Sequence, residues 1–119
     1  MKEGERPLIV NILGTEYEIS FKSEETDERL KDIAGYCNSY TKKIVIDKIG
    51  VEKYEFDFKD AFAKETLRHE IVHAFLSESG LKFDGNVWNG SWAKNEEMVD
   101  WIAIQFPKIL KAFQETDCL

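Results

Sequence analysis

Both histidines of this 119-residue chain fall in one pentapeptide, His69-Glu70-Ile71-Val72-His73. On an α-helix, residues four apart lie on the same face, so two imidazoles with this spacing can bind one zinc ion. Glu70 points close to the same face, where a carboxylate can take a proton from a metal-bound water. The pentapeptide therefore predicts Zn²⁺ as cofactor, with His69 and His73 as metal ligands and Glu70 as catalytic base. Two solvent-facing histidines on an ordinary amphipathic helix are the alternative.

A catalytic zinc site needs a third protein ligand and an open fourth position. Glu96 can supply this ligand from a second, antiparallel helix. Asp100 follows one turn later on the same face and can accept a hydrogen bond from the non-ligating nitrogen of a ligand histidine. Glu97 competes for the ligand role, but Trp101 stands four residues after it, so we favour Glu96. The alternative is that both glutamates are only negative charges at a helix N-terminus.

Three apolar runs predict the strands of one small sheet. Residues 8–13 and 17–21 flank Gly14 and indicate a β-hairpin, and residues 42–47 form a compact run rich in β-branched side chains. The acidic stretch 23–33 is either a solvated loop or contains a short helical turn. These runs predict about three strands.

Two helices are expected to carry the chemistry. Helical spacing of apolar residues begins near Asp60, and Gly80 stands where a glycine would end the helix. A second helix begins near Asn95, a residue type that favours the N-cap, and Pro107 either ends it or opens a short final helix. We expect a single α+β domain over residues 1–119, in which a small twisted sheet packs on the active-site helix and a C-terminal helix completes the site.

The charge balance of the chain disfavours two classes of binding partner. The chain has 16 Lys and Arg against 23 Asp and Glu, a formal net charge of -7, which disfavours a nucleic acid or an acidic membrane surface. The sequence contains no apolar run of the roughly 18 residues that a membrane helix needs, and we expect no secretory signal. Cys37 and Cys118 lie far apart in the sequence, and we expect reduced thiols, with a single long-range disulfide as the alternative. We expect a cytoplasmic protein of open oligomeric state.

The pentapeptide followed by Asn95-Glu96-x-x-x-Asp100 resembles the gluzincin metallopeptidases, whose pattern is HExxH and a downstream NExxxD-type segment. The short chain looks most like minimal zincins of the ImmA/IrrE type, and residues 67–81 resemble small phage- or prophage-encoded metallopeptidases. The resemblance implies a zincin-like fold, with the metal ligands, the general base and the histidine partner at His69, His73, Glu96, Glu70 and Asp100. Val99 departs from the alanine usual in the family.

Several roles stay open. The strand Ile44–Ile46 either borders a cleft, where a peptide can pair with its edge, or lies inside the sheet. Trp88 and Trp92 either wall that cleft, cover the metal as a lid or cap the core. Cys37 is either a small buried thiol or a ligand of an inhibited state. The candidates for stabilising an oxyanion are Tyr36, Tyr40, Tyr54 and Arg68.

The expected function is that of a zinc-dependent metallopeptidase, which hydrolyses peptide bonds of a protein or peptide with a zinc-bound water activated by Glu70. The alternative is a non-catalytic, metal-stabilised phage module that binds a host or repressor protein. A DNA-linked protease of the SprT-like kind shares the HExxH motif but usually has a basic surface. The acidic balance of this chain counts against it.

Overall fold

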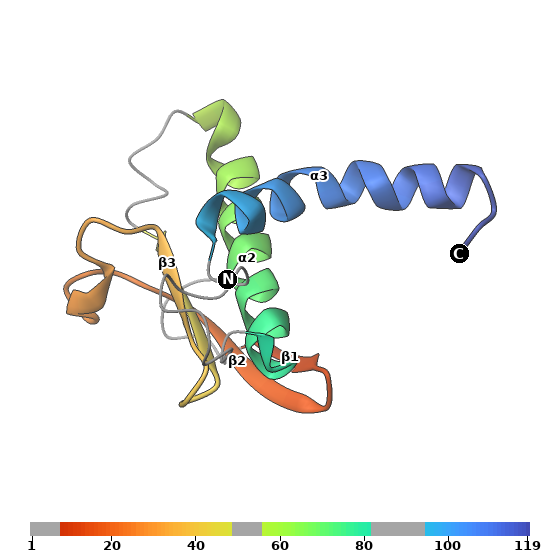
Figure 1. Cartoon of the computed structure of the whole chain (residues 1–119). Coiled ribbons are helices and arrows are strands. Elements are labelled where there is room, and N and C mark those ends of the chain that lie inside the picture. Colours follow the sequence, from red (N-terminus) through yellow and green to blue (C-terminus); the bar gives the residue numbers. More distant parts are fainter. Residues whose placement is uncertain (1–7, 49–55, 82–94) are drawn as a thin grey trace.

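The computed structural model describes residues 8–48, 56–81 and 95–119, and it has the expected α+β class. A mixed sheet lies on one side of a long helix, and a second long helix crosses the first (Figure 1). The described residues form four strands rather than about three. The elements in chain order are β1 (Leu8–Ile12), β2 (Thr15–Lys22), the 3₁₀-helix η1 (Glu28–Leu30), β3 (Gly35–Asn38), β4 (Lys43–Asp47), α2 (Phe56–Glu78) and α3 (Glu96–Glu115).

The strand order β1-β2-β4-β3 places β4 inside the sheet. β1 and β2 form the expected hairpin, and its two turn residues, Leu13 and Gly14, have the positive φ angles that a type I′ turn needs. β4 pairs in parallel with β2 and antiparallel with β3, so that Ile44 lies between Ile19 and Cys37. The interior alternative is therefore correct for β4, and the expectation that it borders a cleft is wrong. Among the described strands, β1 and β3 are the outer ones.

The connection between β2 and β4 holds the strand that the sequence pattern does not predict. Gly35–Asn38 contains no β-branched residue, so its composition does not favour a strand. It forms β3 because β4 supplies hydrogen-bonding partners for its backbone. Earlier in the same connection, the helical-turn alternative for residues 23–33 is correct: Asp27 caps η1, and Leu30 is buried.

The core lies between α2 and one face of the sheet. Buried side chains from alternate strand positions meet α2, as the period of two requires; they are Ile12, Tyr17, Ile19, Ile44 and Ile46, with Ala74 from the helix. The buried polar positions of α2, namely Thr66, Glu70 and Ser77, lie in one stripe with Ala74, because the spacings are four, four and three. This stripe contains small residues and one carboxyl group, so α2 lies close to the sheet.

The end of α2 and the start of α3 follow the sequence, but α2 begins at Phe56, four residues before the expected start near Asp60. Gly80, with a φ of 88°, follows the end of α2, and the Asn95 side chain accepts a hydrogen bond from the Met98 N–H at the start of α3. Pro107, however, lies inside α3, which continues to Glu115, so the expected end or new helix at Pro107 is wrong. α3 also crosses α2 steeply instead of running antiparallel to it (Figure 1). Neither helix is long and apolar enough, within the described residues, to cross a membrane.

A carboxylate anchors the C-terminal end of α2 to the sheet. Glu78 accepts hydrogen bonds from the Thr15 hydroxyl at 2.9 Å, the Tyr17 hydroxyl at 2.7 Å and the Lys42 ammonium at 2.8 Å. The Lys42 hydrogen bond, followed by those of Tyr17 and Thr15, lowers the pKa of Glu78 from 4.5 to about 2. The folded state therefore stabilises the ionised form of Glu78.

This anchor predicts a pH dependence of stability. Because the folded-state pKa of Glu78 is depressed, its contribution is present above pH 4.5 and is lost as the pH falls towards 2. We expect Glu78→Gln to lower Tm at neutral pH and to flatten the fall of Tm between these two pH values. Thermal unfolding across the range measures both, with the exposed Glu16→Gln as the control. If Tm falls with pH equally steeply in Glu78→Gln and in the parent, ionised Glu78 does not stabilise the fold.

The close approach of β3 to α2 predicts a cost for one added methyl group. A Cβ on Gly35 would lie 2.8 Å from the Val45 carbonyl oxygen and 3.3 Å from Cγ2 of Thr66. Since the nearest atom is backbone, the strand would have to shift, and we expect Gly35→Ala to reduce the free energy of unfolding by about 1–3 kcal/mol. Denaturant unfolding measures this, with the exposed Glu16→Ala as the control. A denaturant midpoint equal to that of the parent would show that Gly35 has more space beside Val45 and Thr66 than these distances indicate.

Candidate metal centre

The two histidines lie on α2 beside its buried stripe. Their side chains are 17% (His69) and 24% (His73) exposed, so both are shielded but can be reached from solvent. The rings meet edge to face with centroids 4.8 Å apart, and the two Nε2 atoms are 3.2 Å apart. The spacing on the helix has therefore brought one nitrogen of each ring to a common point.

Glu96 reaches the same point from α3. Its Oε1 lies 2.5 Å from Nε2 of His73 and 3.5 Å from Nε2 of His69. The Asn95 cap starts the helix so that Glu96 occupies its first position, whereas Glu97 is one residue further round. Among the contacts described for these histidines, Glu96 is present and Glu97 is not. The structure thus brings together the residues that the spacing pointed to.

Asp100 holds the ring of His69 from the other side. Its Oδ1 lies 2.6 Å from Nδ1 of His69, and Asp100 stands one turn after Glu96 on α3. A carboxylate only accepts, so the hydrogen lies on Nδ1, and we assign His69 the tautomer whose Nε2 carries a lone pair. That lone pair is on the nitrogen nearest to His73 and Glu96. Asp100 therefore orients His69 and leaves Nε2 able to bind a cation.

Glu70 lies on the buried side of the histidines. It is 6% exposed, and its carboxylate lies with the histidine nitrogens in a group whose ligand atoms are all within 4.8 Å of one another. Burial is the main cause that raises the pKa of Glu70 from 4.5 to about 7; Glu96 and Asp100 raise it further, and His69 opposes the rise. A carboxyl group with a pKa near neutrality can both accept and return a proton.

The donor set fits a zinc ion. Two imidazole nitrogens and one carboxylate oxygen are ligands that zinc takes in catalytic sites. For Zn–N bonds of about 2.0–2.1 Å and tetrahedral angles, two ligand nitrogens are about 3.3 Å apart. The observed 3.2 Å between the Nε2 atoms of His69 and His73 agrees with that separation. Glu96 is 62% exposed, so its side chain can adjust around an ion.

Neither of the two candidate oxyanion-stabilising tyrosines among the described residues, Tyr36 and Tyr40, contacts the histidines in the interactions described. The Tyr36 hydroxyl donates to Asp27, and burial together with this hydrogen bond raises its pKa to about 12. Tyr36 alternates with Gly35 and Cys37, which face α2, so Tyr36 faces away from the helix. Tyr40 is 81% exposed in the turn between β3 and β4. Tyr54 lies outside the described residues, as do Trp88 and Trp92.

The cysteines are not joined to each other. Cys37 is half-buried and packs against the hydrophobic core, Cys118 is exposed near the C-terminus, and neither is in a disulfide. The packing of Cys37 agrees with its interpretation as a small core residue, and it does not belong to the group around His69.

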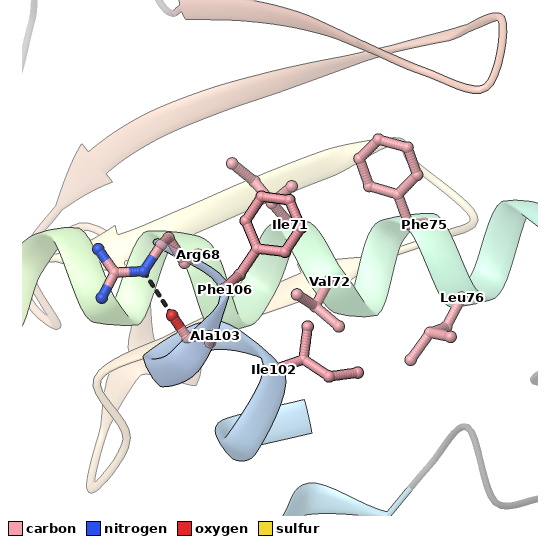
Figure 2. Close-up of a pocket in the computed structure, with 8 residues that line it drawn as sticks. All are labelled: Arg68, Ile71, Val72, Phe75, Leu76, Ile102, Ala103 and Phe106. Atoms are coloured by element: carbon pink, nitrogen blue, oxygen red, sulfur yellow. Dashed lines mark hydrogen bonds between the residues drawn. The ribbon is translucent and has the colours of Figure 1, made fainter. Parts of the chain in front are cut away.

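Sequence reasoning missed what Arg68 contacts. Its Nε donates to the backbone carbonyl of Ala103 at 2.5 Å, at the crossing of α2 and α3 (Figure 2). The bond adjoins an open pocket of about 440 Å³, whose other lining residues are apolar: Ile71, Val72, Phe75, Leu76, Ile102, Ala103 and Phe106. The signal in the sequence was Pro107, four residues after Ala103, because a proline leaves that carbonyl without its helical donor.

No family model, no curated protein and no solved structure matches this chain. The resemblance to gluzincins therefore stays a prediction. Support for a function comes from the chemistry and geometry of the residues around His69 and His73.

Proposed function

We propose that the protein is a zinc-dependent metallopeptidase whose site is formed by α2 and the first turns of α3. The observation that carries this proposal is the convergence of three donor atoms from two helices: Nε2 of His69, Nε2 of His73 and Oε1 of Glu96, separated by 2.5–3.5 Å. The simpler alternative, two histidines on a solvated helix face, does not by itself predict that a carboxylate from another helix approaches both rings. It also does not predict that Asp100 orients one of them.

Each residue has a distinct task in this proposal. His69, His73 and Glu96 would hold the ion, and Asp100 would keep Nε2 of His69 free of its hydrogen. Zinc in such a site supplies a Lewis acid that polarises a carbonyl and lowers the pKa of a water molecule. The three protein ligands leave one coordination position for this chemistry.

Glu70 moves the proton. Its carboxylate accepts a proton from the attacking water and delivers it to the amine nitrogen that leaves when the peptide C–N bond breaks. In the metal-free site, burial raises the pKa of Glu70 to about 7. A bound cation would favour the carboxylate form, which is the form that accepts the proton. Burial also keeps Glu70 beside the histidines instead of in solvent.

A protein or peptide substrate is favoured by the position of β3. β3 is an outer strand of the described sheet, and it packs on α2 where Gly35 approaches Thr66, one turn before Glu70. An extended peptide can pair with an outer strand of a sheet through its backbone. We propose that the edge of β3, and not Ile44–Ile46 inside the sheet, pairs with the substrate.

The metal content of purified variants tests the ligand set. We expect about one zinc ion per chain in the parent, loss of zinc in His73→Ala and Glu96→Ala, and full retention in Glu97→Ala. Elemental analysis of all divalent metals measures this, and Glu97→Ala is the matched control because it removes the neighbouring carboxylate of the same first turn. Zinc retained by Glu96→Ala would exclude Glu96 as a ligand, and another ion in the parent would replace zinc in the proposal.

The role of Glu70 is tested with fluorescein-labelled casein as an unfolded substrate. Glu70→Gln keeps the shape of the side chain but cannot accept the proton, so we expect zinc to stay bound and cleavage to fall by about 10²–10⁴-fold. Glu97→Gln serves as the control and should cleave at the parent rate. Cleavage by Glu70→Gln at the parent rate would remove Glu70 from the mechanism. A parent that binds zinc but does not cleave casein would favour the non-catalytic interaction module instead.

A further inference from the structure

Pro107 creates a specific defect in α3. Proline has no backbone N–H, so the carbonyl of Ala103, four residues earlier, lacks its helical donor. Ala103 is 1% exposed, so solvent has little access to compensate. A buried carbonyl without a partner destabilises the folded state. A donor from outside α3 is therefore needed at this position.

Arg68 is that donor. Its guanidinium Nε lies 2.5 Å from the Ala103 oxygen, and Figure 2 shows the bond among the apolar side chains where the two helices cross. A charged donor forms a stronger hydrogen bond than the amide that proline lacks. Arg68 therefore restores the missing hydrogen bond and at the same time joins α2 to α3.

The position of this bond connects it to the metal centre. Arg68 precedes His69 on α2, and Ala103 follows Asp100 by three residues on α3. The Arg68–Ala103 and His69–Asp100 hydrogen bonds thus join adjacent residues of α2 to adjacent turns of α3. Any change in the separation of the helices at Ala103 would move Asp100 and Glu96 relative to the histidines.

We propose that Arg68 is a positioning residue: it replaces the hydrogen bond that Pro107 cannot donate, and it thereby sets the approach of Asp100 and Glu96 to His69 and His73. Only the expected effect of Arg68 on metal affinity rests on the proposed function. The helix contact itself can be tested on the metal-free protein.

A double-mutant cycle tests the replacement of the hydrogen bond. In the presence of EDTA, we expect Arg68→Met to raise the unfolding equilibrium constant roughly tenfold in the parent, because Ala103 then has no donor. In the Pro107→Ala background the new N–H of residue 107 supplies a donor, and the same change should cost only a few-fold. Equal costs in the two backgrounds would overturn the proposal. Arg68→Lys provides a second variant that keeps a charged donor if Arg68→Met does not fold.

The tautomer of His69 tests positioning without any metal. ¹⁵N NMR of the imidazoles in EDTA should show hydrogen on Nδ1 in the parent and in the exposed control Lys108→Met. A mixture of tautomers is expected in folded Arg68→Met, because Asp100 no longer lies at hydrogen-bonding distance. Arg68→Lys should recover the parent spectrum at least in part. An unchanged His69 spectrum in Arg68→Met would overturn the positioning role.

Zinc affinity supplies the final comparison, measured by competition with a chelating dye at a temperature where every variant is folded. We expect the Kd for zinc to rise about tenfold in Arg68→Met, as for residues that support ligands, and to stay at the parent value in Lys108→Met. An unchanged Kd in Arg68→Met would contradict the inference. A parent that binds no zinc would overturn the proposed function, while the unfolding cycle and the His69 spectrum would still decide the role of Arg68.

Discussion

The packing of α2 on one face of the sheet determines where the other described elements can lie. A stripe of Thr66, Glu70, Ala74 and Ser77 faces the strands. Small side chains in the stripe and Gly35 in β3 allow a close approach. With this stripe buried, the neighbouring face of the helix is only partly covered, and His69 and His73 lie there. The same packing buries Glu70 and raises its pKa, so the unusual carboxyl group is a direct consequence of the fold.

The second helix completes the site through polar contacts at its N-terminal half. Asn95 starts α3, Glu96 and Asp100 contact the histidines, and Ala103 receives Arg68. The C-terminal half extends away from the sheet (Figure 1). α3, which brings the third donor, is thus positioned by its buried apolar residues Val99 and Ala103 and by a few hydrogen bonds near the site. These hydrogen bonds hold Glu96 and Asp100 beside the histidines, as the proposed metal chemistry requires.

Local patterns predicted much of this arrangement. Alternation and β-branched residues indicated β1, β2 and β4, and Gly80 and Asn95 indicated the ends of the helices. The pattern did not predict β3, because Gly35–Asn38 has low strand propensity and becomes a strand by pairing with β4. Pro107 predicts a helix boundary locally, because proline has no N–H to donate within the helix. The compensation comes from Arg68, on another helix.

The spacing of His69 and His73, the carboxyl group between them and the cap that begins α3 follow from local sequence, because backbone hydrogen bonds set the period of a helix wherever it lies. Three further features depend on tertiary contacts: Glu96 contacts the histidines, β4 lies inside the sheet, and α3 passes through Pro107 unbroken. Each of these outcomes depends on a contact between groups distant in the chain. Propensities and short spacings carry information about neighbours along the chain, and no local pattern records which distant group supplies the missing partner.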